Sequence, residues 1–112
     1  MPVTMYHNPR CNTSRRTLAL LREKGVEPTI IEYLKTPYTA AQLKQLLGQL
    51  KMPASKLLRK KEAAAAIDPS KLSEDQLIET MVKNPIIVER PIVVSGRKAA
   101  LGRPPEAVLA VL

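Results

Sequence analysis

The first part of the chain alternates between short apolar runs and one amphipathic segment. An apolar-leaning run at residues 2–6 leads into the polar stretch 7–16, and leucines at helical spacing follow it. Residues 29–34 are rich in the β-branched and aromatic side chains that favour strands. The pattern therefore predicts a strand, a helix over about 13–24 and a second strand parallel to the first, which together form a βαβ unit.

The middle of the chain has the pattern of several short helices. Thr39 and Ser73 each precede a stripe of apolar residues, and both are side chains that cap helix N-termini well. The alanine-rich run 61–66 has high helix propensity. We expect a helical insertion at about 39–83 within a single domain that spans residues 1–112.

Strand patterns return near the end of the chain. Residues 92–95 form an apolar run, Ser95-Gly96 predicts a turn, and 97–101 can pair with the run as a hairpin. Prolines 104 and 105 suit the first turn of a last helix. The order βαβ, helices, ββα predicts an α/β protein of the thioredoxin-like plan, with a mixed four-stranded sheet.

The only cysteine of the chain, Cys11, falls at the turn between the first strand and the first helix. Helix N-termini stabilise anions, and arginines 10, 15 and 16 lie beside it, so we expect a thiol that is largely ionised near neutral pH. A role as a small buried apolar residue fits its polar neighbours less well. Because one cysteine cannot form an internal disulfide, redox chemistry at Cys11 requires a thiol from a second molecule.

The formal net charge is +8, but the basic residues are scattered as pairs and one triplet, and the chain has only three aromatic residues. This disfavours a nucleic acid, for which basic stripes and stacking aromatics are typical. It leaves a solvated basic surface or the attraction of a small anionic substrate, and charge alone does not decide between them. No apolar run reaches the length of about 18 residues that a membrane helix needs. We therefore expect a cytoplasmic protein that binds neither nucleic acid nor membrane, and no motif indicates a metal, nucleotide or flavin.

A set of spaced motifs resembles the glutaredoxin-coupled arsenate reductases. The resemblance covers the chain nearly end to end, and the motifs occur in the same order. The matching pieces are Tyr6-His7-Asn8-Pro9, Cys11-x-Thr13-Ser14-Arg15, Glu27-Pro28, Tyr33-Leu34, Thr36-Pro37, Leu57-Leu58-Arg59-Lys60, Asn84-Pro85-Ile86, Arg90-Pro91-Ile92-Val93-Val94 and Gly102-Arg103-Pro104.

The resemblance implies a function in arsenic detoxification. It makes Cys11 the nucleophile that attacks arsenate, and it assigns His7 and Ser14 to the support of the thiolate. It also implies glutathione as co-substrate and glutaredoxin as electron donor, without a tightly bound cofactor, and the fold implies a cis bond before Pro91. We expect the protein to be a monomer. From the sequence alone three arginines would be read as solvated surface residues, but the resemblance assigns them to hold the oxyanion: Arg59, Arg90 and Arg103.

Two residues beside the cysteine depart from the family pattern. Asn12 stands where many of these reductases have glycine, and Arg10 is bulkier than the small residue often found there. Two other functions remain open. One is a glutathione-dependent thiol–disulfide oxidoreductase without arsenate activity. The other is an RNA-polymerase-binding regulator of the same fold, although such regulators usually carry Cys-x-x-Cys and here Ser14 takes the second position.

Overall fold

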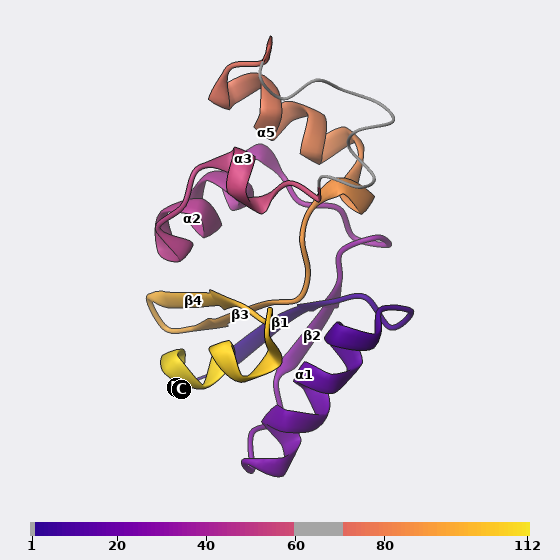
Figure 1. Ribbon diagram of the computed structural model, residues 1–112, viewed down its shortest axis with the longest axis vertical. Helices are drawn as coiled ribbons and strands as arrows, with labels where there is room; N and C mark the ends of the chain where they lie inside the picture. Colours follow the sequence, from indigo (N-terminus) through magenta and orange to yellow (C-terminus); the bar gives the residue numbers. More distant parts are fainter. Residues whose placement is uncertain (1, 60–70) are drawn as a thin grey trace. The chain divides into compact units, whose positions relative to one another are not determined.

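The computed structural model describes residues 2–59 and 71–112, which form two compact units. One unit combines Met1–Thr36 with Arg90–Leu112, and the other comprises Pro37–Glu89. Each unit has its own secondary structure, drawn in Figure 1. Most of the predicted helical insertion falls within the second unit, while the predicted helix at 61–66 lies outside the described residues.

The first unit is built on a four-stranded sheet (Figure 1). Its strands are β1 (Val3–His7), β2 (Thr29–Glu32), β3 (Ile92–Ser95) and β4 (Lys98–Leu101), in the order β2-β1-β3-β4. β1 pairs with β2 in parallel, whereas β1–β3 and β3–β4 are antiparallel. The predicted mixed four-stranded sheet of an α/β fold is therefore confirmed.

Two helices pack with this sheet and with each other. Helix α1 (Asn12–Glu23) joins β1 to β2, and the 3₁₀ helix η3 (Pro105–Val111) follows β4. The core between them contains four fully buried side chains: Met5, Leu21, Val93 and Val108. These residues come from β1, α1, β3 and η3, so the two helices and the sheet share one core.

The structure corrects the predicted bounds at two places. β2 ends at Glu32 because the N–H groups of Lys35 and Thr36 both turn back to the Glu32 carbonyl, each at 2.9 Å. The last helix is of the 3₁₀ type, with hydrogen bonds between residues three apart such as that from Ala107 N–H to the Pro104 carbonyl at 3.0 Å. At seven residues this is a long 3₁₀ helix, since side chains three apart eclipse one another in this geometry.

The second unit contains α2 (Ala40–Leu50), α3 (Ala54–Leu57), α5 (Glu74–Lys83) and the 3₁₀ turn η2 (Pro85–Ile87). Thr39 and Ser73 each form a complete capping box, as the sequence predicts. The Glu74 carboxylate accepts from the Ala54 N–H at 2.9 Å, which ties the start of α3 to the start of α5. After α5 the chain forms η2, and Val88 then makes an isolated antiparallel bridge with Leu58.

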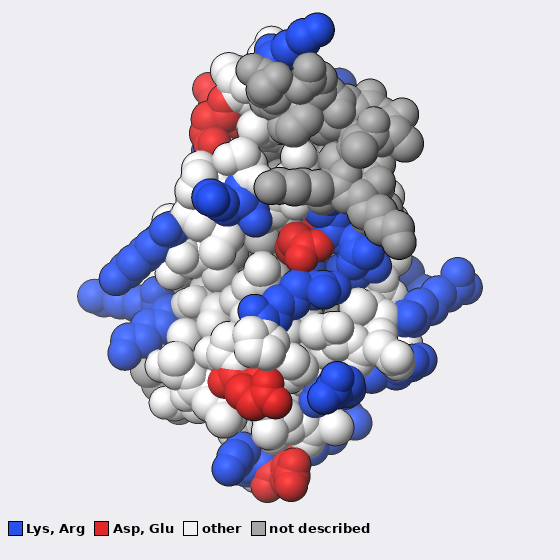
Figure 2. Space-filling view, in the orientation of Figure 1, with Lys and Arg blue, Asp and Glu red and all other residues white. Residues whose placement is uncertain are grey.

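Charged side chains are dispersed over the face that Figure 2 shows, with lysines and arginines separated by neutral and acidic residues. This matches the scattered basic pairs in the sequence. Among residues 2–59 and 71–112, no helix is long and apolar enough to span a bilayer.

Burial in the core of the first unit predicts how a substitution there changes the free energy of unfolding. Leu21 has no exposed surface, so Leu21→Ala should leave a cavity and lower the free energy of unfolding by about 2–5 kcal/mol. Leu34→Ala is the control, because Leu34 is 39% exposed and should change stability little. Urea denaturation followed by circular dichroism measures both. Equal losses for the two variants would contradict this description of the core.

Candidate active site

The loop that carries Cys11 joins β1 to α1, and Asn8 holds it closed. The Asn8 carbonyl accepts from Cys11 N–H at 3.0 Å, and its side-chain oxygen accepts from Arg10 N–H at 3.0 Å. Asn8 is only 4% exposed. Sequence reasoning did not single it out, although an Asn-Pro step before a helix is a recognisable turn signal.

His7 and Ser14 meet behind this loop. His7 Nδ1 lies 2.6 Å from Ser14 Oγ, and that hydroxyl also accepts from the Asn8 N–H at 3.1 Å. Both side chains are buried. Burial is the main cause that lowers the pKa of His7, partly opposed by the Glu32 carboxylate, and the lowered pKa favours the neutral ring. The contact fixes the end of β1 to the first turn of α1.

The electrostatic surroundings of Cys11 favour the thiolate. Burial raises the pKa of the thiol, but hydrogen bonds from the backbone N–H groups of Ser14 and Thr13 and from the Arg90 side chain outweigh it. The pKa of Cys11 therefore lies below its ordinary value. The donors are the first N–H groups of α1, which have no acceptor within the helix.

Two of the three predicted arginines lie at this cysteine. Arg103 Nη2 is 3.8 Å from Cys11 Sγ, and Arg103 Nε donates to the Arg90 carbonyl at 2.9 Å. Arg90 is 8% exposed. The Arg90–Pro91 bond is cis, as the thioredoxin-like fold implies, and so is Arg103–Pro104.

The third predicted arginine belongs to the second unit. Arg59 N–H donates to the Ile87 carbonyl at 2.6 Å, and its Nε lies 3.7 Å from a Glu89 carboxylate oxygen. Both contacts stay within that unit. The assignment of Arg59 to the site remains a prediction.

The sequence also did not identify Gly102 as a residue that shapes the site. Its N–H donates to the Pro91 carbonyl at 2.9 Å, and a Cβ at this position would lie 2.7 Å from Pro91 Cγ and 2.7 Å from Thr17 Oγ1. These distances leave no room for a side chain. Gly102 therefore lets the chain run close to Pro91 just before Arg103, which contacts the cysteine.

The departures from the family pattern at positions 10 and 12 lie on the surface. Asn12 Oδ1 accepts from Arg15 Nη2 at 2.5 Å, and Arg15 Nη1 donates to the Pro9 carbonyl at 3.3 Å. The added amide is thus held by Arg15 on the outer side of α1. Arg10 is exposed as well.

The arrangement brings a thiolate nucleophile together with two guanidinium groups. Guanidinium groups bind paired oxygens of tetrahedral oxyanions, and a depressed pKa activates a cysteine for attack. The described residues contain no cluster of three or more His, Cys, Asp or Glu side chains that could hold a metal ion. With a thiolate beside two guanidinium groups, the site can form a covalent bond to an anion that Arg90 and Arg103 hold in place.

The low pKa of Cys11 can be tested by alkylation. The iodoacetamide rate should reach half its maximum at a pH below the value of about 8.5 that is usual for a free cysteine. Arg90→Gln should move this midpoint upward, because the variant removes a hydrogen bond and a positive charge from the thiolate. Arg97→Gln, in the exposed turn after β3, removes the same charge and should leave the midpoint unchanged. An unshifted midpoint in Arg90→Gln would contradict this account.

Close packing at Gly102 makes a second prediction for the site. Gly102→Ala should displace Arg103 from Cys11, so it should slow alkylation at pH 7 as well as lower stability by about 1–3 kcal/mol. Gly48→Ala is the matched control, since a Cβ there meets nothing within 4 Å and Gly48 lies inside α2. That variant should gain stability by about 0.5–1 kcal/mol. Thermal unfolding and alkylation rates measure both, and a fully reactive Gly102→Ala protein would refute the link to Arg103.

Comparisons with known proteins identify the family of this chain. The chain is 52% identical to the uncharacterized protein YfgD of Escherichia coli (strain K12), over 98% of this chain and 96% of that one. It is 44% identical to an arsenate reductase of the same organism, over 98% of this chain and 80% of that one. The structure of an arsenate reductase from Vibrio cholerae matches with a TM-score of 0.91 and 42% identity, over 100% of this chain and 98% of that one. With the ArsC family model also matching residues 6–111, this chain belongs to the ArsC family.

Proposed function

We propose that this protein reduces arsenate to arsenite, with Cys11 as the nucleophile and glutathione and glutaredoxin as the source of electrons. The observation that carries the proposal is the contact of Arg103 Nη2 with Cys11 Sγ at 3.8 Å, at a thiol whose pKa is lowered. Relatives named arsenate reductase, at 41–44% identity, support the choice of oxyanion.

The first step forms a bond between sulfur and arsenic. The Cys11 thiolate attacks the arsenic of arsenate, and one arsenate oxygen leaves as water after protonation. Arg90 and Arg103 hold the remaining oxygens and balance their negative charge. We include Arg59 as a third guanidinium that binds the oxyanion.

The later steps need two thiols from outside the chain, because the sequence holds a single cysteine. Glutathione condenses with the cysteine-bound arsenic and releases a second water. A glutaredoxin thiolate then attacks the glutathione sulfur, and the electron pair of the arsenic–sulfur bond stays on arsenic, which is reduced from As(V) to As(III). Water releases arsenite and restores the Cys11 thiol, while glutaredoxin and glutathione leave as a mixed disulfide.

A glutathione-dependent thiol–disulfide oxidoreductase remains the second candidate. The same low-pKa thiol would serve that reaction, and the relative YfgD, which matches this chain over 96% of its own length, has no assigned activity. Reactivity of Cys11 toward a glutathionylated peptide without any response to arsenate would favour this candidate.

A coupled assay tests the proposal. With arsenate, glutathione, glutaredoxin, glutathione reductase and NADPH, the wild type should consume NADPH in an arsenate-dependent manner, and Cys11→Ser should not. Arg103→Ala should raise the KM for arsenate roughly tenfold or more, because a charged hydrogen-bond donor to the oxyanion is lost. Arg97→Ala, which removes a charge from the turn after β3, is the control and should keep the wild-type KM. Absence of arsenate-dependent consumption by the wild type would refute the proposal.

A further inference from the structure

A hollow of about 310 Å³ adjoins the loop of Cys11. This is at the lower end of the range of about 300–1,000 Å³ typical of small-molecule sites. Residues 7–10 of the loop form one wall, and Glu32, Leu34 and Lys35 at the end of β2 form the other. Arg10, which belongs to this wall, is the residue that directly precedes Cys11.

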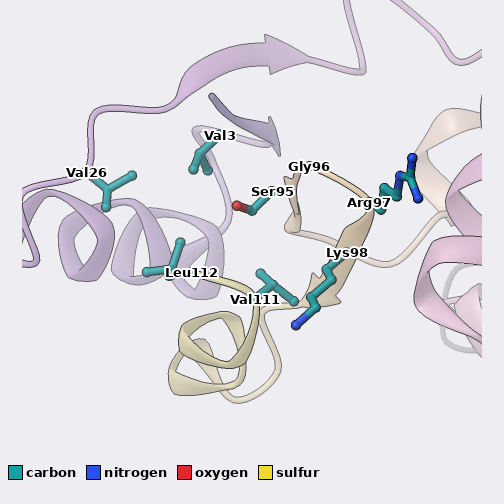
Figure 3. Close-up of a pocket in the computed structure, with 8 residues that line it drawn as sticks. All are labelled: Val3, Val26, Ser95, Gly96, Arg97, Lys98, Val111 and Leu112. Carbon is teal, nitrogen blue, oxygen red and sulfur yellow. The ribbon is translucent and has the colours of Figure 1, made fainter. Parts of the chain in front are cut away.

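A larger pocket of about 570 Å³ lies elsewhere in the first unit and differs in character. It adjoins Val3 at the start of β1, whereas the Cys11 loop follows the other end of that strand. Figure 3 shows Val3, Val111 and Leu112 around this pocket, with the Arg97 side chain extending away from them. Its lining includes neither Cys11 nor the residues of the Cys11 loop, so it offers no link to the chemistry of Cys11.

The hollow beside the loop carries charges of both signs. Arg10 and Lys35 are exposed cations, Glu32 is a half-buried carboxylate, and Pro9 and Leu34 add apolar surface. Lys35 Nζ lies 3.7 Å from Glu32 Oε1. Ion pairs with this exposure stabilise a protein little. Lys35 and Glu32 can therefore separate and each pair with an opposite charge on a ligand.

The position of Glu32 is fixed relative to the loop. Glu32 is the register partner of His7 in the parallel β1–β2 pair, and His7 is held by Ser14 at 2.6 Å. Asn8, which closes the loop, lines the same hollow. The backbone at Glu32 therefore keeps a fixed register with the end of β1, from which the Cys11 loop begins.

We propose that this hollow is the glutathione site. Glutathione has two carboxylates, one ammonium and a central thiol, and the hollow offers two cations, one carboxylate and an adjacent reacting cysteine. Arg10 and Lys35 bind the carboxylates, Glu32 binds the ammonium, and the glutathione sulfur reaches the group bound to Cys11. The inference rests on the proposed use of glutathione and adds the residues that select it over other thiols.

The test uses a reaction that needs no arsenate. The Cys11 thiolate attacks glutathione disulfide, a bond forms between Cys11 Sγ and one glutathione sulfur, the original disulfide breaks, and the other glutathione leaves as a thiolate. Mass spectrometry of the modified protein gives the rate. The same rate with 2-hydroxyethyl disulfide, which is uncharged, serves as the reference, and the ratio of the two rates reports recognition of glutathione alone.

Two variants separate a specific site from general attraction of an anion. Lys35→Gln should lower the ratio roughly two- to fivefold, as expected for the loss of one exposed ion pair. Glu32→Gln should lower it by a similar factor, about two- to fivefold, because the ammonium loses its partner. General attraction predicts the opposite for Glu32→Gln, since removing a negative charge should speed the reaction with an anionic disulfide. Lys24→Gln and Glu23→Gln, exposed at the end of α1, are the controls and should leave the ratio unchanged.

The outcomes are distinct. A ratio that falls in both Lys35→Gln and Glu32→Gln but in neither control supports the glutathione site, even if the coupled assay shows no arsenate turnover. A ratio that rises or stays constant in Glu32→Gln overturns it, even if arsenate is reduced. A wild-type ratio equal to that of the Cys11 thiol in the urea-unfolded chain would also overturn it, because no recognition would then exist.

Discussion

The hydrogen bonds around the Ser14 hydroxyl determine the geometry on which the rest of the site depends. This one oxygen joins His7 at the end of β1 and the Asn8 backbone N–H to the first turn of α1. The turn that results places Cys11 as the residue before the helix, where its sulfur accepts from free backbone N–H groups. Nucleophile activation is thus a consequence of how a strand is connected to a helix.

The thiolate also affects stability in a pH-dependent way. Because the folded protein lowers the pKa of Cys11, the unfolded chain binds this proton more tightly than the folded one. The stabilisation is complete above the ordinary pKa of the thiol and is lost as the pH falls through the lowered value. The same interactions that make the cysteine reactive therefore also favour the folded state at pH values above the lowered pKa.

Sequence patterns predicted most of the fold and the centre of the site. Hydrophobic periodicity and the capping residues Thr39 and Ser73 predicted helices, because both depend on residues close in sequence. The polar residues around Cys11 predicted the turn between β1 and α1. Gly102 could not be found this way, because its importance comes from contacts with Pro91 and Thr17, which are distant in sequence. The end of β2 is set by hydrogen bonds of a turn at Glu32, which the strand pattern does not show. The 3₁₀ form of the last helix depends on hydrogen bonds between residues three apart, and hydrophobic periodicity does not reveal them.

Arg103 uses the two ends of its guanidinium for different purposes. Nε is anchored on the Arg90 carbonyl, while Nη2 faces the cysteine sulfur. A lysine carries its charge on a single nitrogen, so it could not bind the Arg90 carbonyl through one nitrogen while a second nitrogen faces the ligand. The guanidinium is planar, and its Nε is held by the Arg90 carbonyl. The orientation of Nη2 is therefore set before any anion binds.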